Sequence, residues 1–296
     1  MSHAAAFRKL LAGPDVIVAP GMYDGMTALL VEQAGFACAY LSGASISFSR
    51  IAQPDIGLMS LTEVGEAVAN IRERLKIPFI VDCDTGFGNA LNTQRTVRMV
   101  ERMGASGIQL EDQSYPKRCG HLAGKSVVPT AEMVGKLKAA LDARQDPNTV
   151  IIARTDAIGV EGFDAALARA HAYMEAGADV LFVEAPQTEE QQIVLGKTFA
   201  GKVPLLANMV EGGRTPMKSA AELHKIGFKI VIFPGAMMRV ITFAATEYLK
   251  TLKTYGETTR IRDRMFDFNG LNAILGTNEI VAGATRYDAN LKKAAE

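Results

Sequence analysis

The chain has 296 residues, of which 48% are hydrophobic and 22% charged, a length and composition that fit one large α/β domain. Lysine plus arginine and aspartate plus glutamate balance at 32 each, which argues against nucleic acid as a partner. The three cysteines are too few for a disulfide framework, residues 230–245 are too interrupted to span a bilayer, and the N-terminus lacks a signal-peptide pattern. We therefore expect a cytoplasmic protein that binds no membrane.

Short aliphatic runs recur along the chain and alternate with segments of helical period. The runs predict eight strands, at 16–19, 37–41, 78–82, 107–111, 150–154, 180–184, 204–208 and 229–233. Helical segments include 62–75, 93–103, 131–143 and 163–176, and several end at glycine just before the next strand. Eight consecutive strand–helix units favour a parallel (β/α)8 TIM barrel, with a doubly wound open sheet as the alternative.

No linker rich in proline, glycine or serine divides the chain. We therefore predict one domain over residues 1–296. The chain continues past the eighth strand, and this C-terminal extension is predicted to be helical and packed on the barrel or on a neighbouring subunit.

Polar residues follow most of the predicted strands at the end where (β/α)8 barrels carry their active sites. Strand 2 ends in the segment Tyr40 to Gly43, and strand 6 ends at Glu184. Strand 7 ends at Asn208. Strands that only turned back to solvent would end in turn residues, so we interpret this pattern as a candidate active site.

Strand geometry places Asp82 and Asp84 on one face, with Cys83 turned away. These two carboxylates and Glu111 would repel each other without a cation, and Asp55 is a further candidate for the cluster. Hard oxygen ligands suit Mg²⁺. Surface acids or salt-bridge partners are the alternative interpretation.

The loop after strand 4 concentrates Lys117, Arg118, Cys119 and His121. Cations beside a thiol favour its thiolate, so Cys119 is predicted to be reactive. A solvated charged loop with a chance cysteine is the alternative.

Other segments could hold an anionic substrate. Arg154 ends strand 5 and could hold a carboxylate or phosphate at two points, although a salt bridge to Glu184 or to another acid at the barrel mouth is a nearly equal alternative. Two loops offer backbone N–H groups and hydroxyls: residues 42–45 with Ser42, Gly43 and Ala44, and residues 212–216 with Gly213, Arg214 and Thr215.

With these residues in place, nearly the whole chain resembles the isocitrate lyase/phosphoenolpyruvate mutase superfamily. The resemblance rests on six motifs in order, at residues 40–43, 54–57, 81–88, 111–113, 117–121 and 153–156. It implies a (β/α)8 barrel with Mg²⁺ or Mn²⁺ at its mouth and a mobile loop at 117–121. It also implies a homotetramer whose eighth helices swap between subunits.

The loop cysteine selects the carbon–carbon lyase branch of this superfamily. Residues 183–186 and 208–216 resemble the 2,3-dimethylmalate lyase and oxaloacetate hydrolase group more than 2-methylisocitrate lyases. The resemblance therefore implies cleavage of a 2-hydroxy dicarboxylate into an α-keto acid such as pyruvate and a carboxylate. The alternatives are 2-methylisocitrate cleavage to pyruvate and succinate, hydrolysis or decarboxylation of oxaloacetate, and a non-catalytic barrel that only binds a ligand.

The resemblance also implies roles for individual residues. Asp84 is the expected direct metal ligand, with Asp82, Asp55 and Glu111 acting largely through water. Cys119 is expected to protonate the leaving carbon, while Lys117, Arg118 and His121 tune it. Tyr40 is one candidate for the general base, which stays unassigned. Substrate carboxylates are expected at Ser42, Gly43, Ala44, Arg154, Glu184, Asn208, Gly213, Arg214 and Thr215.

Overall fold

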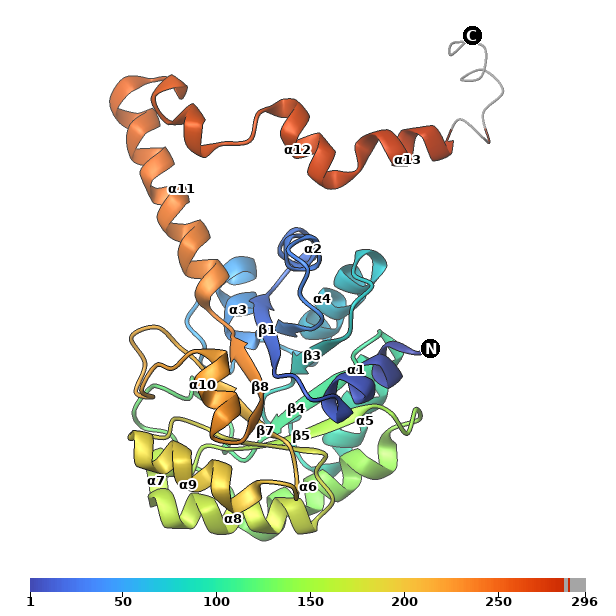
Figure 1. The fold of residues 1–296 in the computed structure, drawn as a ribbon, viewed down its shortest axis with the longest axis vertical. Coiled ribbons are helices and arrows are strands. Elements are labelled where there is room, and N and C mark those ends of the chain that lie inside the picture. The colour runs from blue at the N-terminus through green and yellow to red at the C-terminus, as the bar shows by residue number, and fades with distance from the viewer. Residues whose placement is uncertain (285–286, 288–296) are drawn as a thin grey trace. The chain divides into compact units, whose positions relative to one another are not determined.

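Eight parallel strands close into a barrel in the computed structural model, which describes residues 1–284 and 287 (Figure 1). Each strand pairs with the next along the chain, and the last pairs with the first. The strands are β1 (Ile17–Met22), β2 (Ala39–Leu41), β3 (Phe79–Asp82), β4 (Gly107–Glu111), β5 (Val150–Thr155), β6 (Val180–Val183), β7 (Leu205–Asn208) and β8 (Phe228–Phe233). The prediction of a (β/α)8 barrel is confirmed, and the open sheet is excluded.

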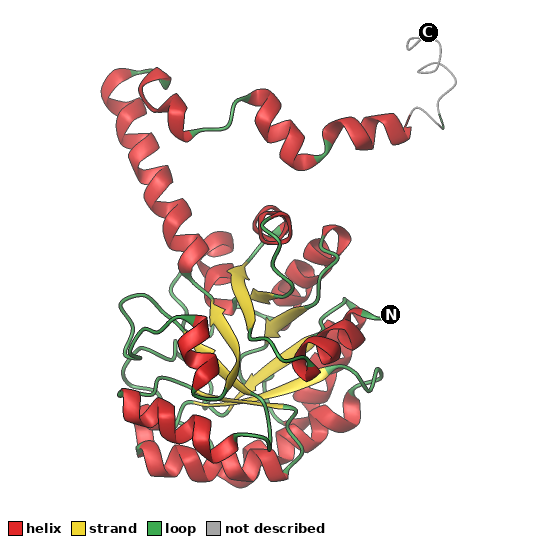
Figure 2. Cartoon of the chain, in the orientation of Figure 1, coloured by secondary structure: helices red, strands yellow, loops and turns green. Residues whose placement is uncertain are grey.

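Helices connect the strands and surround the barrel (Figure 2). Several of these helices begin after a residue whose side chain caps the first turn. At the start of α4, Ser60 and Glu63 form a reciprocal capping box. Up to the last strand the helices are α1 (His3–Ala12), α2 (Gly25–Gln33), α3 (Gly43–Ile51), α4 (Leu61–Arg74), α5 (Ala90–Arg102), α6 (Thr130–Ala143), α7 (Ile158–Glu161), α8 (Phe163–Glu175), α9 (Glu189–Phe199) and α10 (Ala220–Lys225).

The chain forms two compact units, residues 1–239 and residues 240–296. Past β8 the described residues up to Ala284 are largely helical, as predicted, while residues 285–286 and 288–296, which the same prediction covered, lie outside the described residues. The helices are α11 (Ala236–Tyr255), a 3₁₀ helix η1 (Thr259–Arg264), α12 (Phe268–Leu275) and α13 (Thr277–Ala284). The single domain over residues 1–296 stays a prediction.

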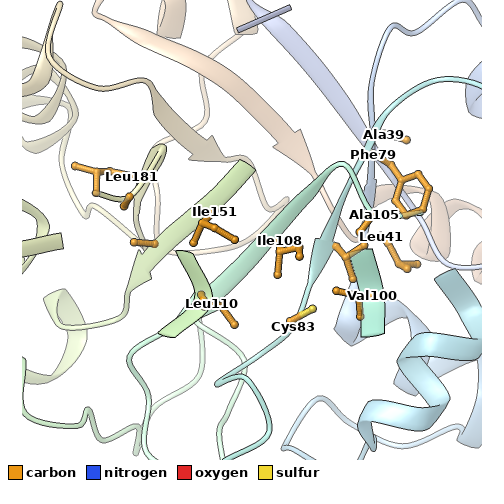
Figure 3. Packing of buried hydrophobic residues seen from close by; sticks show 14 of the residues in the cluster. Ala39, Leu41, Phe79, Cys83, Val100, Ala105, Ile108, Leu110, Ile151 and Leu181 are labelled. Carbon is orange, nitrogen blue, oxygen red and sulfur yellow. The ribbon is translucent and has the colours of Figure 1, made fainter. Parts of the chain in front are cut away.

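Strand residues alternate between two apolar clusters. Ile108 and Leu110 of β4 belong to the cluster between the strands and the helices, which Figure 3 shows from close by. The intervening residues, Gln109 and Glu111, therefore project from the opposite face of the strand. Inside the barrel a smaller cluster contains Tyr40 and Phe182. The same alternation buries Cys83 behind the acids, as the sequence predicted.

The N-terminal end of the barrel is closed by α1. Its Phe7 is fully buried, and a Cβ added to Gly107 would lie 2.9 Å from the Phe7 ring. Glycine therefore lets β4 pass directly over this aromatic plug. Because α1 covers the N-terminal end of the barrel, its C-terminal end is where a polar site can form. Within residues 1–284 and 287, no helix has both the length and the apolar character needed to cross a bilayer.

Candidate active site

A cavity of about 90 Å³ lies at the C-terminal ends of the strands. It brings together side chains from most of the eight strand–loop units, as the sequence pattern predicted. Ten predicted site residues line it: Tyr40, Ser42, Ala44, Asp55, Asp82, Cys119, His121, Arg154, Glu184 and Asn208.

The predicted acids gather around one lysine. Lys117 Nζ lies 2.8 Å from Asp84 Oδ1 and also donates a hydrogen bond to Asp55 Oδ1. Its side chain is only 4% exposed. Burial alone would lower the pKa of Lys117, but the carboxylates of Asp84 and Asp55 outweigh burial and raise this pKa well above its usual range. Lys117 is therefore a buried cation inside the acid cluster.

Asp82 and Asp84 converge near the start of α3, where a Cβ on Gly43 would lie 3.4 Å from an oxygen of each. Burial raises the pKa of Asp84 to about 7, with further repulsion from Asp82 and Asp55. Burial also raises the pKa of Glu111 well above its usual range. These groups hold charge poorly unless cations accompany them.

Arg154 lies at the centre of a second set of buried charges. Its Nε and Nη2 donate to Asp156 at 2.9 and 3.1 Å, and its Nη1 lies 3.2 Å from Glu111 Oε2. The alternative prediction, a salt bridge to Glu184 or to another acid at the barrel mouth, is therefore also confirmed, although the contact with Glu184 itself is longer, at 3.9 Å. Arg154 therefore lines the cavity, and its two hydrogen bonds to Asp156, which does not line the cavity, fix the orientation of the guanidinium.

Glu184 joins two other predicted residues. Asn208 Nδ2 donates to both of its carboxylate oxygens, at 3.3 and 3.2 Å, and His121 Nε2 lies 3.0 Å from Oε1. The backbone N–H of Arg214 donates to His121 Nδ1 at 3.1 Å. Since Nδ1 accepts that bond, the ring proton of neutral His121 is on Nε2, facing Glu184.

Cys119 lies at the cavity, but the prediction of a favoured thiolate was wrong. Burial raises the pKa of Cys119 and outweighs the His121 backbone N–H and Arg154, which lower it, while Asp55 and Glu184 raise it further. Arg118, expected to tune the thiol, is exposed and donates to the Ala123 carbonyl at 3.3 Å. A protonated thiol is suited to donating a proton rather than to attacking as a nucleophile.

The loop at 212–216 contacts the site indirectly. None of Gly213, Arg214 and Thr215 lines the cavity. A Cβ on Gly213 would lie 2.8 Å from the His121 ring, and the Thr215 hydroxyl is buried without a hydrogen-bond partner. In this structure the loop therefore supports His121, and its predicted contact with substrate stays a prediction.

Sequence reasoning missed Gln109, which is fully buried. The Tyr40 hydroxyl donates to Gln109 Oε1 at 2.9 Å, and Gln109 Nε2 donates to Asp82 Oδ1 at 3.1 Å. The carboxylate requires the amide nitrogen on its side, so the Tyr40 proton points to Gln109 and away from the cavity. Burial raises the pKa of Tyr40 well above its usual range, so Tyr40 is a neutral acceptor. The position of Gln109 in the otherwise apolar run at 107–110 is the sequence feature that could have indicated a buried functional amide.

Further lining residues also escaped prediction. Phe48, Val210 and Pro234 add apolar surface, and Arg239 adds a cation that pairs with Glu211 at 2.7 Å. Phe48 lies on α3 and Val210 on the loop after β7. Pro234 comes just before α11, and Arg239 lies in its first turn. No residue pattern in the sequence marks them, because the barrel geometry brings them together.

Comparison with known proteins identifies the fold family. The model for the phosphoenolpyruvate phosphomutase family matches residues 7–253. The chain is 45% identical to a 2,3-dimethylmalate lyase from Eubacterium barkeri, over 95% of this chain and 96% of that protein. It is 43% identical to a 2-methylisocitrate lyase from Aeropyrum pernix, over 98% of this chain and 91% of that protein.

Solved structures agree with this assignment. A crystal structure of 2,3-dimethylmalate lyase, described as a member of the PEP mutase/isocitrate lyase superfamily, superposes with a TM-score of 0.91. It shows 37% identity over 98% of this chain and 97% of that chain. A phosphonopyruvate hydrolase in complex with oxalate and Mg²⁺ superposes with a TM-score of 0.87, at 31% identity over 97% and 99%. The chain belongs to the phosphoenolpyruvate phosphomutase family, within the PEP mutase/isocitrate lyase superfamily.

Proposed function

We propose that this protein is a carbon–carbon lyase that cleaves a 2-hydroxy dicarboxylate, of the 2,3-dimethylmalate type, into pyruvate and a carboxylate. The observation that carries the proposal is the joint placement of Cys119 and Arg154 on one small cavity. An anion-binding guanidinium and a protonated thiol are the groups that a cleavage ending in protonation of carbon needs. The 2,3-dimethylmalate lyase relative supports the same reaction class.

The acid cluster fits a divalent cation in its chemistry. Asp55, Asp82, Asp84 and Glu111 bring buried carboxylate oxygens together, which are the ligands Mg²⁺ prefers, and Glu111 Oε1 is buried without a hydrogen-bond partner. Within the described part of the chain, however, no three acidic, histidine or cysteine side chains are arranged to hold a metal, since Lys117 lies among them. We propose that Asp84 would hold Mg²⁺ or Mn²⁺ directly, with Asp82, Asp55 and Glu111 acting largely through water.

The bound cation would supply charge stabilisation for the substrate 2-hydroxyl and the keto acid formed from it. The protein's own groups supply the rest. Arg154 holds a substrate carboxylate, and the first-turn N–H groups of α3, after Ser42, offer a second anion site. Tyr40 accepts a hydrogen bond from the substrate hydroxyl, because its own proton is given to Gln109.

Cys119 acts after the C2–C3 bond breaks. As that bond breaks, the 2-hydroxyl gives its proton to a general base, which stays unassigned, and C2 becomes the keto carbon of pyruvate. The electron pair of the C2–C3 bond remains on C3, and the Cys119 thiol gives its proton to C3 of the fragment that leaves as the carboxylate product. The thiolate then regains a proton from solvent. The raised pKa of Cys119 keeps the thiol protonated beforehand, and the neighbouring His121 and Glu184 form the wall of the cavity around it.

The shape of the cavity favours a small substrate. Its volume of about 90 Å³ is below the range of about 300–1,000 Å³ for ligand pockets. Phe48, Val210 and Pro234 offer apolar surface to methyl groups. The rim cation Arg239 is already paired with Glu211, so a third carboxylate there would compete with Glu211. These features favour 2,3-dimethylmalate over 2-methylisocitrate, the second candidate.

We also propose that the protein assembles into a homotetramer through the unit at 240–296. None of its described residues is buried within the chain, and Phe243, Phe266 and Phe268 are 70%, 70% and 83% exposed. Such apolar surface is typical of an interface between subunits. The three cysteines are free, which fits the cytoplasm as the proposed location.

A substrate screen tests the function. Purified protein with Mg²⁺ is offered 2-hydroxy dicarboxylates and tricarboxylates, and keto-acid release is measured. We expect pyruvate from 2,3-dimethylmalate. Oxalate and acetate from oxaloacetate, with no pyruvate from any hydroxy acid, would instead show a hydrolase.

A further inference from the structure

The side chain of Lys125 joins the cysteine-bearing loop to the end of β5. Lys125 Nζ donates to Asp156 Oδ1 at 2.9 Å and also donates to the backbone carbonyl of Gly120. The Lys125 and Asp156 side chains are 3% and 0% exposed. Because the ammonium is shielded from water, both bonds are stronger than their equivalents on the surface.

At Gly120 the loop backbone packs directly against two side chains that line the cavity. A Cβ at this position would lie 2.5 Å from Arg154 Nη2 and 2.6 Å from Glu184 Cγ. Only glycine allows the backbone to lie directly against these two side chains. The position of the Gly120 carbonyl therefore determines where its neighbours Cys119 and His121 lie over the cavity.

Asp156 is the other anchor of Lys125, and it also orients Arg154. Two nitrogens of Arg154 donate to the Asp156 carboxylate. The backbone N–H of Asp156 donates to Asp112 Oδ1 at 2.9 Å. Burial alone would raise the pKa of Asp156, but Arg154 and Lys125 outweigh burial and lower it. The anchor is thus a fixed, ionised carboxylate.

We propose that Lys125 is a positioning residue that holds Cys119 and His121 over the cavity by tying the Gly120 carbonyl to Asp156. The same ammonium couples loop position to the orientation of Arg154, since both depend on Asp156. Lys125 does not line the cavity, so it acts through Gly120 and Asp156 rather than on the substrate. At the other end of the loop, Lys117 makes a separate attachment to Asp55 and Asp84.

The test uses Lys125→Met, which keeps side-chain length and removes the charge. Cys38 and Cys83 are fully buried, so Cys119 is the cysteine that iodoacetamide reaches in the folded protein, with Cys119→Ser as the blank. We expect Lys125→Met to raise the alkylation rate about tenfold, because the loop leaves the cavity once its charge-assisted bonds are lost. The rate is followed across pH, so that accessibility and thiol pKa are separated.

Turnover gives a second measurement, which rests on the lyase function proposed above. We expect kcat to fall about 10²-fold with KM changed less than about threefold, because Cys119 is misplaced while Arg154 keeps its own two hydrogen bonds to Asp156. The alkylation measurement needs no substrate. A protein that shows no lyase activity therefore overturns the proposed function and leaves the alkylation result to decide the role of Lys125.

Two further variants make the outcome decisive. Lys197→Met, on the exposed face of α9, is the matched control and should match wild type in both measurements. Lys125→Gln keeps a donor for the Gly120 carbonyl and should give intermediate values; it replaces Lys125→Met if that variant does not fold. A folded Lys125→Met or Lys125→Gln protein that is alkylated within twofold of the wild-type rate would overturn the proposal, whatever its kcat.

Discussion

Lys117 Nζ lies 2.8 Å from Asp84 Oδ1, so a lysine of the cysteine-bearing loop occupies the acid cluster proposed for a divalent cation. The ammonium offsets the repulsion between the buried carboxylates of Asp55 and Asp84. It also links the cluster to the loop, since Lys117 is two residues from Cys119. A cation that binds Asp84 must share these carboxylates with the Lys117 ammonium.

Lys117→Met is expected to destabilise the metal-free protein. Removing one partner of a buried ion pair typically costs about 3–5 kcal/mol, and here Asp55 and Asp84 would both lose their cation. Urea denaturation in chelator measures the free energy of unfolding, with Lys138→Met on the exposed face of α6 as control. Added Mg²⁺ should restore more stability to Lys117→Met than to wild type. A loss no greater than that of the control would contradict this account of the cluster.

Metal removal should abolish turnover, and Mg²⁺ or Mn²⁺ should restore it. The physical reason is the cluster of four buried carboxylates, in which Glu111 Oε1 has no hydrogen-bond partner. Asp84→Ala should cost more activity than Asp82→Ala if Asp84 is the direct ligand. Full activity in excess chelator would exclude the metal-dependent mechanism, and the reverse order of the two variants would exclude Asp84 as the principal ligand.

Alkylation of Cys119 should be slow at neutral pH. The thiolate is the reacting form, and burial raises the pKa of this thiol above its ordinary value of 9.0. Since a higher pKa leaves less thiolate at any given pH, the alkylation rate should rise with a midpoint above pH 9. Iodoacetamide modification across pH, with glutathione as reference, measures this midpoint. A midpoint near 7 would mean that the loop cations do activate the thiol.

Arg154 and Arg214 should differ sharply in their effects on catalysis. Arg154→Met removes the guanidinium that lines the cavity and leaves Glu111, Asp156 and Glu184 without their shared cation. A loss of at least 10²-fold in kcat/KM, or about 3 kcal/mol, is therefore expected. Arg214 contributes a backbone N–H to His121 and does not line the cavity, so Arg214→Met should cost less than about threefold. If both variants lost kcat/KM equally, Arg214 would have to bind the substrate directly.

Much of the barrel could be predicted from the sequence, because each strand is a short aliphatic run bounded by glycine or polar residues. The run at 107–111 coincides with β4, and the helix expected at 131–143 is α6 at Thr130–Ala143. Alternation along β3 also predicted that Cys83 would be buried behind Asp82. These features depend on local patterns that propensity and periodicity describe well.

The pairing of charges could not be predicted in the same way. Lys117 and Arg118 are adjacent in the sequence, yet one is buried among acids and the other is exposed. The pKa of Cys119 depends on burial by residues from several loops, which outweighs the nearby cations. Gln109, Lys125 and Arg239 acquire their contacts only when distant segments meet at the barrel mouth. Such contacts depend on tertiary geometry, for which residue type and spacing give little information.

Substrate choice gives the most direct test of the central claim. The measurement is kcat/KM for pyruvate release from 2,3-dimethylmalate and from 2-methylisocitrate at the same Mg²⁺ concentration. We predict that 2,3-dimethylmalate is preferred, by tens to hundreds of times, since a poorly matched group typically costs about 1–3 kcal/mol. If 2-methylisocitrate is preferred by a hundredfold or more, the assignment of a small dicarboxylate to this cavity is contradicted.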